Sequence, residues 1–186
     1  KTNKEYVLFV KNSYEIVTVM KVIFLDVDGV LNSTRSFVAS KYTDYIKSDV
    51  IGPTVFHNHQ NHDPIAIGLV NKLCDNDDIK IVVSSTWRLV GEEGVIKDLR
   101  AMGITGDFAT PAITIQLTDI RGEEVNDWLK NHGTKNNVTH HVILDDGSDF
   151  YPSQPHVKSN IDIGFSYKNY LEAKKYLGLN TFNLVL

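Results

Sequence analysis

Short runs of apolar residues, separated by segments with helical periodicity, set the pattern of this chain. Near-continuous apolar runs occupy residues 21–25, 79–83 and 141–144. Runs of this length without polar alternation are typical of strands that are covered on both faces of a sheet. The pattern therefore predicts three buried strands.

Helical periodicity fills the spaces between these runs. Asp63 and Pro64 form a good N-cap and first-turn pair, and the apolar residues that follow recur at helical spacing (Ile67, Val70, Leu73 and Cys74). Further helices are expected over 92–102, from about 121 to a stop at Gly133, and over 167–177. Strands that alternate with helices indicate an α/β fold of Rossmann-like type, with a mainly parallel central sheet and helices on both faces.

Composition narrows the class of protein. The chain has 186 residues, 42% hydrophobic and 23% charged, which suits one domain. We expect this domain to occupy residues 20–186 and residues 1–19 to be an N-terminal extension. A net charge of −4 argues against a strongly basic protein that coats nucleic acid, although a local basic groove remains compatible with it.

Localisation is inferred from two features. No apolar run approaches the ~20 residues that span a bilayer, so we expect no membrane association. The single cysteine, Cys74, cannot form an intramolecular disulfide, and its apolar neighbours predict a buried core thiol. An unpaired thiol fits a reducing compartment, and we expect the protein to be cytoplasmic.

Polar residues follow each of the three predicted strands. They are Asp26-Val27-Asp28-Gly29-Val30 after the first, Ser84-Ser85-Thr86-Trp87-Arg88 after the second and Asp145-Asp146-Gly147-Ser148-Asp149 at the end of the third. Each segment alone is explained as a turn. Because ligands of such sheets bind at the carboxyl ends of the strands, the three segments together predict a functional site.

The residue types at this edge indicate metal and phosphate chemistry. Asp26 and Asp28 lie two apart on an extended segment, so their side chains leave on the same side. Neighbouring carboxylates repel unless a cation joins them, and a set of anionic oxygens suits Mg²⁺. We expect Asp26 and Asp28 as metal ligands, completed by Asp145 or Asp146, with Asp149 contributing more weakly.

The same residues have catalytic roles in this interpretation. Asp26 is the nucleophile that attacks phosphorus and forms an acyl phosphate, while Asp28 protonates the leaving oxygen and then activates water. Gly29 allows a tight turn beside the phosphate. Donors to the phosphate are expected from the side chains and backbone that follow the second strand, namely Ser84, Ser85 and Arg88.

These residues resemble the motifs of the haloacid dehalogenase (HAD) phosphatases. Asp26-Val27-Asp28-Gly29-Val30-Leu31 resembles the first motif, the strand that ends at Ser84 the second, and Leu144-Asp145-Asp146 the acidic fourth. In this family an Asp at the position of Asp28 implies phosphate ester hydrolysis instead of dehalogenation. The third motif is a phosphate-binding Lys or Arg, for which Arg121 is the candidate and Lys97 and Lys130 are weaker alternatives.

A narrower resemblance concerns substrates. Ser-Ser-Thr-Trp-Arg, Arg-Gly-Glu-Glu and Leu-Asp-Asp-x-x-Asp-Phe together resemble the small HAD domains of RNA and DNA repair proteins, similar to the 3′-phosphatase part of polynucleotide kinase-phosphatases. This resemblance implies that Arg88 contacts phosphate. The phosphate-binding loop of a kinase is absent from the sequence.

Family members often select substrates with a cap domain after the first motif. Here residues 32–63 have no strong helical repeat and are too few for a full cap, so we expect a small flap and an open site. Its aromatic residues, Tyr42, Tyr45 and Phe56, either stack on a base or pack the flap onto the core. His57, His59 and His62 lack the spacing of a known zinc site and are expected to contact substrate or nothing in particular.

The leading hypothesis is a Mg²⁺-dependent phosphomonoesterase that acts through an aspartyl-phosphate, on polynucleotide 3′-phosphate ends or nucleotides. A 5′-nucleotidase, another small-molecule phosphatase or a phosphoprotein phosphatase is the alternative enzyme. An inactive HAD-fold binding module is the alternative outside enzymes.

Overall fold

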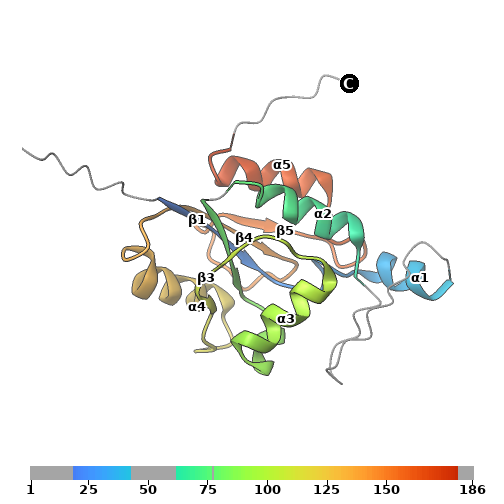
Figure 1. The fold of residues 1–186 in the computed structure, drawn as a ribbon, viewed down its shortest axis with the longest axis horizontal. Coiled ribbons are helices and arrows are strands. Elements are labelled where there is room, and N and C mark those ends of the chain that lie inside the picture. Colours follow the sequence, from blue (N-terminus) through green and yellow to red (C-terminus); the bar gives the residue numbers. More distant parts are fainter. Residues whose placement is uncertain (1–18, 43–61, 77, 180–186) are drawn as a thin grey trace, which may run out of the picture.

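Five parallel strands form one sheet in the order β3-β2-β1-β4-β5 (Figure 1). Their bounds are β1 Met20–Leu25, β2 Ile79–Val83, β3 Phe108–Ile113, β4 Val138–Asp145 and β5 His156–Lys158. The computed structural model describes residues 19–42, 62–76 and 78–179. The expectations for residues 1–18, Tyr45, Phe56, His57 and His59 lie outside the described residues.

β1 is the central strand, and its register aligns the ends of its two neighbours. Leu25 pairs with Val83 on β2 and with Leu144 on β4. The ladder continues one step further, because the backbone N–H of Asp26 donates to Leu144 O at 3.0 Å and that of Ser84 donates to Leu25 O at 2.9 Å. The residues that follow β1 and β2 therefore lie level with the end of β4.

Helices cover both faces of the sheet, as the pattern predicted. They are α2 Pro64–Leu73, α3 Glu92–Met102, α4 Arg121–Trp128 and α5 Tyr167–Tyr176, whereas α1 Thr34–Tyr42 lies in the insert after β1. Ile23 and Leu25 share one buried cluster with residues of α2, α3 and α5, and Phe24 shares the other with residues of α4. Figure 1 shows α2 and α5 side by side. The α/β Rossmann-like class is confirmed.

The capping signals of α2 act as expected. The Asp63 carboxylate accepts from the backbone N–H of Ile65 at 2.8 Å, and Pro64 stands at the first helical position. The N–H groups of the first helical turn have no partner within the helix, so this contact stabilises the helix end. The His-rich segment before α2 thus ends in a structural cap, and Arg35 pairs with the same carboxylate at 2.6 Å.

Several elements differ from the pattern. β3 and β5 were not predicted from the sequence; β3 contains Pro111, which an edge strand tolerates, and β5 has only three residues. α4 ends at Trp128 and continues as a π-helical turn over Leu129–Gly133, so the stop at Gly133 is correct but the α-helix is shorter. A 3₁₀ helix over Thr86–Val90 follows β2.

The insert after β1 contains a helix that its sequence did not indicate. Ser36 is the only buried residue of α1. Because the helix buries no apolar residue, its sequence has only a weak apolar repeat. It is anchored by backbone bonds from Thr34 N to Ile161 O and from Arg35 N to Asp162 O, both 3.0 Å. Residues 43–61 lie outside the described part, so the flap stays a prediction.

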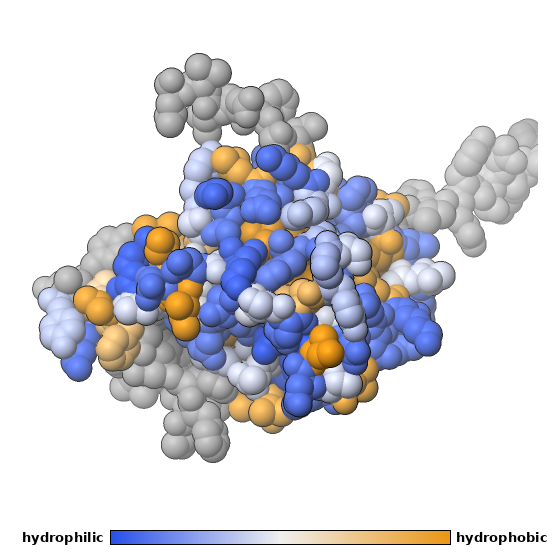
Figure 2. Space-filling view, turned by 180° about the vertical axis from the view of Figure 1, so that it is seen from behind, coloured by the Kyte–Doolittle hydropathy of each residue, from blue (hydrophilic) through white to orange (hydrophobic). Residues whose placement is uncertain are grey.

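The face seen in Figure 2 is mainly hydrophilic, with separate hydrophobic residues among polar ones. Among the described residues, none of the helices has the length and apolar character that crossing a bilayer requires. Cys74, expected to be a buried core thiol, is half-buried and packs against the core, and burial raises the pKa of its thiol to about 12.

Candidate active site

The strand order creates a switch point beside β1. The connection from β1 leads to β2 on one side, while β4 lies on the other side. In open α/β sheets the ligand crevice lies outside the carboxyl ends of the strands at such a point. Asp26 directly follows β1 and Asp145 ends β4, so both predicted carboxylates stand at this crevice.

Three carboxylates meet there. Oxygen atoms of Asp26, Asp145 and Asp146 lie within 4.8 Å of one another. Asp26 and Asp145 are buried and Asp146 is half-buried. Sequence alone left open which of Asp145 and Asp146 joins Asp26, and the structure brings both to it. Carboxylate oxygens at this separation are the donor set that Mg²⁺ prefers, so the residues fit the expected metal.

Arg121 joins two of these carboxylates. Its Nη1 donates to Asp26 Oδ1 and to Asp145 Oδ2, both at 3.1 Å, and also to the carbonyl oxygen of Ser84. Burial opposes the charge of Arg121, but Asp26 and Asp145 raise the pKa of its guanidinium overall. The candidate for the third-motif cation therefore lies in direct contact with the candidate nucleophile.

The buried carboxylates resist ionisation without a further cation. Burial, and then the charge of Asp145, raise the pKa of Asp26 to about 7. Arg121 and hydrogen bonds from Ser85 and from the backbone of Val27 act in the opposite direction. Burial likewise raises the pKa of Asp145 to about 6. The single positive charge of Arg121 does not balance the negative charge of three carboxylates, which is a second reason to expect a divalent cation.

Asp28 stands apart from the acidic cluster. Its side chain is exposed, with Oδ2 accepting from the indole N–H of Trp87 at 3.0 Å and Oδ1 accepting from the Asn32 amide at 2.8 Å. The other end of that amide accepts from the backbone N–H of Gly29. Sequence reasoning missed Trp87 and Asn32, although Trp87 belongs to the Ser-Ser-Thr-Trp-Arg motif. A carboxylate oriented by two donors at the solvent boundary suits a proton carrier.

The segment after β2 supplies buried polar groups beside Asp26. Arg88 is 8% exposed, and its Nη2 donates to Glu124 Oε1 at 2.9 Å. Glu124 in turn accepts from the Thr114 hydroxyl at 3.2 Å. Ser84 Oγ and Arg88 Nη1 are buried and have no hydrogen-bond partner among the described residues. Leaving a buried donor without an acceptor is costly. A bound oxyanion would supply the missing acceptor to both atoms.

Asp149, the fifth predicted metal ligand, contacts a helix end instead of the other carboxylates. It is exposed, and its Oδ2 accepts from the backbone N–H of Arg121 at 2.8 Å. Its carbonyl oxygen accepts from Gly122 N at 3.0 Å. Asp149 therefore caps α4 and lies outside the three-carboxylate cluster. By this contact it fixes the helix end that carries Arg121.

Gly29 lies where a side chain does not fit. Its φ is +74°, and a Cβ built there lies 2.4 Å from Asp146 Cγ. The Gly29 carbonyl accepts from the Ser159 hydroxyl at 2.8 Å, which ties the turn to the segment after β5. The glycine is thus required both by its backbone conformation and by the close approach of Asp146.

A comparison with family models identifies the domain. Residues 22–170, well over half of the chain, match the model of the HAD domain in Swiss Army Knife RNA repair proteins. The chain belongs to this family. The resemblance inferred from the motifs is therefore confirmed. No curated protein and no solved structure matches the chain.

Membership in this HAD family gives the kind of chemistry in outline. A phosphatase-type hydrolase is the activity that such a domain suggests, and the acidic cluster is able to bind a metal. The matched region includes β2, β4 and β1 from Val22 onward, with all the predicted site residues.

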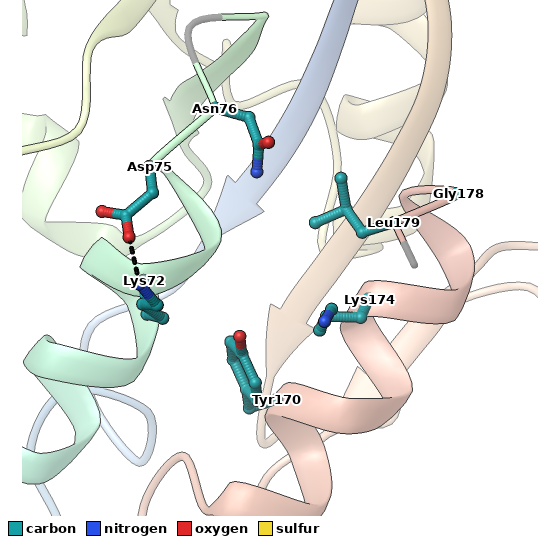
Figure 3. Close-up of a pocket in the computed structure, with 7 residues that line it drawn as sticks. All are labelled: Lys72, Asp75, Asn76, Tyr170, Lys174, Gly178 and Leu179. Carbon is teal, nitrogen blue, oxygen red and sulfur yellow. Dashed lines mark hydrogen bonds and ion pairs between the residues drawn. The ribbon is translucent and has the colours of Figure 1, made fainter. Parts of the chain in front are cut away.

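A second hollow lies at the opposite edge of this HAD domain. It has a volume of about 420 Å³ and lies between the ends of α2 and α5 (Figure 3). Lys72 and Asp75 pair across its rim at 2.6 Å, and Lys174 lies over the ring of Tyr170. This edge holds the amino ends of the strands, so it is not the ligand crevice of the fold.

Proposed function

We propose that this HAD domain is a Mg²⁺-dependent phosphomonoesterase that works through an aspartyl-phosphate intermediate. The observation that carries the proposal is the joint contact of Arg121 with Asp26 and Asp145, beside Asp146. A cation and a carboxylate cluster around one buried Asp match the needs of a nucleophile that attacks a dianionic phosphate.

In this mechanism Asp26 attacks the phosphorus atom of the ester and the bond from phosphorus to the leaving oxygen breaks. Asp28 gives that oxygen its proton. Asp28 then takes a proton from water, whose oxygen attacks the phosphorus of the aspartyl-phosphate. Inorganic phosphate leaves and Asp26 is regenerated.

The phosphoryl oxygens are held by the groups around Asp26. Arg121 and Arg88 supply guanidinium donors, and Ser84 and the segment through Ser85 supply hydroxyl and backbone donors. Asp26, Asp145 and Asp146 would hold Mg²⁺, which neutralises charge on the carboxylates and the phosphate when bound. The exposed Asp28 and the capping Asp149 remain weaker candidates for the metal shell.

For the substrate we propose a polynucleotide with a 3′-phosphate end. The family description, which names RNA repair proteins, supports this choice, as does the motif containing Arg88. A 5′-nucleotide, another small phosphate ester or a phosphoprotein is the competing substrate class.

The test is a substrate panel with purified protein in Mg²⁺ and in EDTA. A 3′-phosphorylated oligonucleotide, nucleoside 5′-monophosphates, phosphoserine peptide and p-nitrophenyl phosphate are compared by phosphate release. We expect Mg²⁺-dependent turnover, with the oligonucleotide giving the highest kcat/KM. Turnover of 5′-monophosphates alone would refute the 3′-end assignment, and no turnover of any ester would refute the phosphatase.

A second measurement addresses the intermediate. Asp26→Asn should abolish turnover, and rapid acid quenching of the wild-type protein during turnover should show one added phosphoryl group by intact mass. The Asp75→Asn variant is the matched control, because Asp75 is an exposed carboxylate at the opposite edge of the sheet. Turnover that survives in Asp26→Asn excludes the covalent mechanism.

A further inference from the structure

The loop that follows the acidic end of β4 lies against the start of α4. Asp149 of this loop holds two N–H groups of the helix, since its Oδ2 accepts from Arg121 N at 2.8 Å and its carbonyl oxygen accepts from Gly122 N at 3.0 Å. Gln154 of the same loop holds a third backbone group, because its Nε2 donates to Gly122 O at 2.8 Å. The main chain on both sides of the Arg121 Cα is therefore bound to this loop.

Gln154 uses both the nitrogen and the oxygen of its amide in this contact. Besides Gly122 O, its Nε2 donates to Asn126 Oδ1 at 3.0 Å, one turn further along α4. Its Oε1 accepts from Tyr151 N at 2.9 Å, within its own loop. The half-buried side chain thus directs its two donors to the helix and its acceptor to the loop, and it joins one to the other.

The close approach of loop and helix requires a glycine. A Cβ built at Gly122 lies 2.5 Å from Gln154 Oε1 and 3.2 Å from both Asp149 O and Phe150 Cα. A larger residue at this position pushes the loop away from the helix. The residue directly after Arg121 is therefore fitted to this loop.

The loop is itself fixed to β4 at both ends. It begins with the candidate metal ligands, since Asp145 ends β4 and Asp146 follows it. Gln154 is followed by Pro155, whose carbonyl oxygen accepts from Ile143 N of β4 at 2.9 Å. A loop held in this way is a firm support for the start of the helix.

The contacts of Arg121 depend on the place where its helix starts. One nitrogen, Nη1, reaches both Asp26 Oδ1 and Asp145 Oδ2 at 3.1 Å. A shift of the helix start by about 1 Å takes these distances outside the range of hydrogen bonds. A misplacement of this size costs an enzyme on the order of 10²-fold in rate.

Tyr151 makes a second contact between the loop and α4, which is less suited to this task. Its hydroxyl donates to Glu123 Oε1 at 3.0 Å, but the side chain of Tyr151 is exposed, so water competes for the bond. Gln154 is half-buried and binds the backbone directly after Arg121.

We propose that Gln154 is a positioning residue that holds the start of α4 and so keeps Arg121 Nη1 in contact with Asp26 and Asp145. The proposal rests on the phosphomonoesterase function above, in which Arg121 is the cation of the phosphate site. It links the segment of the metal ligands to that cation through one side chain.

A double-mutant cycle on Gln154 and Arg121 tests the proposal. The wild type, Gln154→Ala, Arg121→Ala and the double variant are compared by kcat for p-nitrophenyl phosphate in Mg²⁺. We expect Gln154→Ala alone to lower kcat by roughly 10- to 100-fold, as when the support of a ligand is removed. In the Arg121→Ala background the same change should lower kcat by less than about twofold, because the residue through which Gln154 acts is gone.

Asn71→Ala is the matched control. The Asn71 amide likewise bridges two backbone groups, donating to Gly103 O at 2.8 Å and accepting from Thr105 N at 2.9 Å. This bridge precedes β3 at the opposite edge of the sheet, so the variant should keep the wild-type kcat.

Stability is measured alongside activity. The melting temperature should fall by a similar amount when Gln154 is replaced in either background, so a lost stability does not account for a loss of kcat that appears only with Arg121 present. Equal fold losses of kcat in both backgrounds overturn the proposal, as does a wild-type kcat in Gln154→Ala. If Gln154→Ala does not fold, Gln154→Met, which keeps the length of the side chain without its hydrogen bonds, replaces it in the cycle.

Failure of the phosphomonoesterase function gives a different result, because the wild type then releases phosphate from none of the esters. The same cycle is in that case measured by the Kd of inorganic phosphate in Mg²⁺, using calorimetry. Binding weakened by Gln154→Ala only where Arg121 is present supports the role of Gln154, and equal weakening in both backgrounds overturns it. A wild type that neither hydrolyses the esters nor binds phosphate overturns both proposals.

Discussion

The indole N–H of Trp87 donates to Asp28 Oδ2 at 3.0 Å, across 59 positions of sequence. Trp87 is 5% exposed and packs in the main core cluster, whereas Asp28 is exposed at the mouth of the site. A rigid core side chain thus holds the carboxylate that we propose as the general acid and base. Asn32 holds its other oxygen.

Trp87→Phe should impair proton transfer to the leaving group. The change keeps an aromatic ring in the core but removes the donor that orients Asp28. We expect kcat/KM to fall by roughly tenfold for an alkyl phosphate, less than the full contribution of acid catalysis, because Asn32 still holds Asp28. The fall should be smaller for p-nitrophenyl phosphate, whose leaving group departs readily as an anion.

Trp128→Phe is the matched control for this measurement. Trp128 donates its indole N–H to Pro111 O at 3.1 Å and packs with Phe24 in the second core cluster, which involves α4. Its variant should lose stability without any dependence on the leaving group. Equal losses for both substrates in Trp87→Phe would show that Trp87 serves only the core.

The metal-free protein should become less stable as the pH rises from about 4 to about 7. Burial raises the pKa of Asp26 to about 7 and that of Asp145 to about 6, so the folded state binds protons more tightly than the unfolded state. The resulting stabilisation is complete below the ordinary aspartate pKa of 3.8 and is lost as the pH passes the folded-state pKa values. Since one pKa unit corresponds to roughly 1.4 kcal/mol, the loss is on the order of a few kcal/mol.

Urea unfolding in EDTA at pH 5 and pH 8 measures this loss. Mg²⁺ should reverse much of it at pH 8, because a cation favours the ionised carboxylates. The Asp26→Asn variant should show a flatter pH dependence, since it removes one of the two buried acids. A metal-free protein that is more stable at pH 8 than at pH 5 contradicts this account.

Arg121→Ala should lower kcat by about 10² to 10³, the range found when one donor to a developing oxyanion is removed. Arg121→Lys should retain more activity. The reason is that Nη1 alone makes the contacts with Asp26, Asp145 and the Ser84 carbonyl, and a lysine ammonium is likewise a single point of charge.

Arg100→Ala serves as the control for Arg121, because Arg100 lies in the last turn of α3 and its Nη1 donates to Ile104 O, away from the site. Its variant should keep the wild-type kcat. Steady-state kinetics with the same ester settle the comparison. If Arg121→Ala and Arg100→Ala have the same effect, Arg121 is not the phosphate-site cation.

Gly29→Ala should weaken Mg²⁺ activation. Any Cβ at this position meets Asp146 Cγ at 2.4 Å, so the carboxylate must move away from Asp26 and Asp145. We expect the Mg²⁺ concentration for half-maximal activity to rise by roughly tenfold or more, as for disturbed support of a metal ligand.

Gly68→Ala is the control for Gly29→Ala. Gly68 lies in α2, and a Cβ there meets nothing within 4 Å. Alanine should therefore stabilise the protein by about 0.5–1 kcal/mol and leave the Mg²⁺ requirement unchanged. An unaltered Mg²⁺ requirement in Gly29→Ala would show that Asp146 is not part of the metal site.

The local sequence pattern was sufficient to predict the elements that are deeply buried. The runs at β1, β2 and β4 are apolar because both faces of these strands are covered. The start of α2 was predicted from its capping residues, Asp63 and Pro64. Pattern failed for α1, which buries little, and for β3 and β5, which lie at the sheet edges. Where burial is slight, the periodic signal is weak.

The sequence by itself determined the family, the fold class and the position of Asp26 at a strand end, because each depends on residues close together along the chain. Only the tertiary structure decided that Arg121 reaches Asp26 across 95 positions, that Trp87 holds Asp28, and that Asp149 caps a helix. The physical reason is the strand order. Side chains of distant segments meet at the crevice only after β4 has paired with β1, and no local periodicity encodes that pairing.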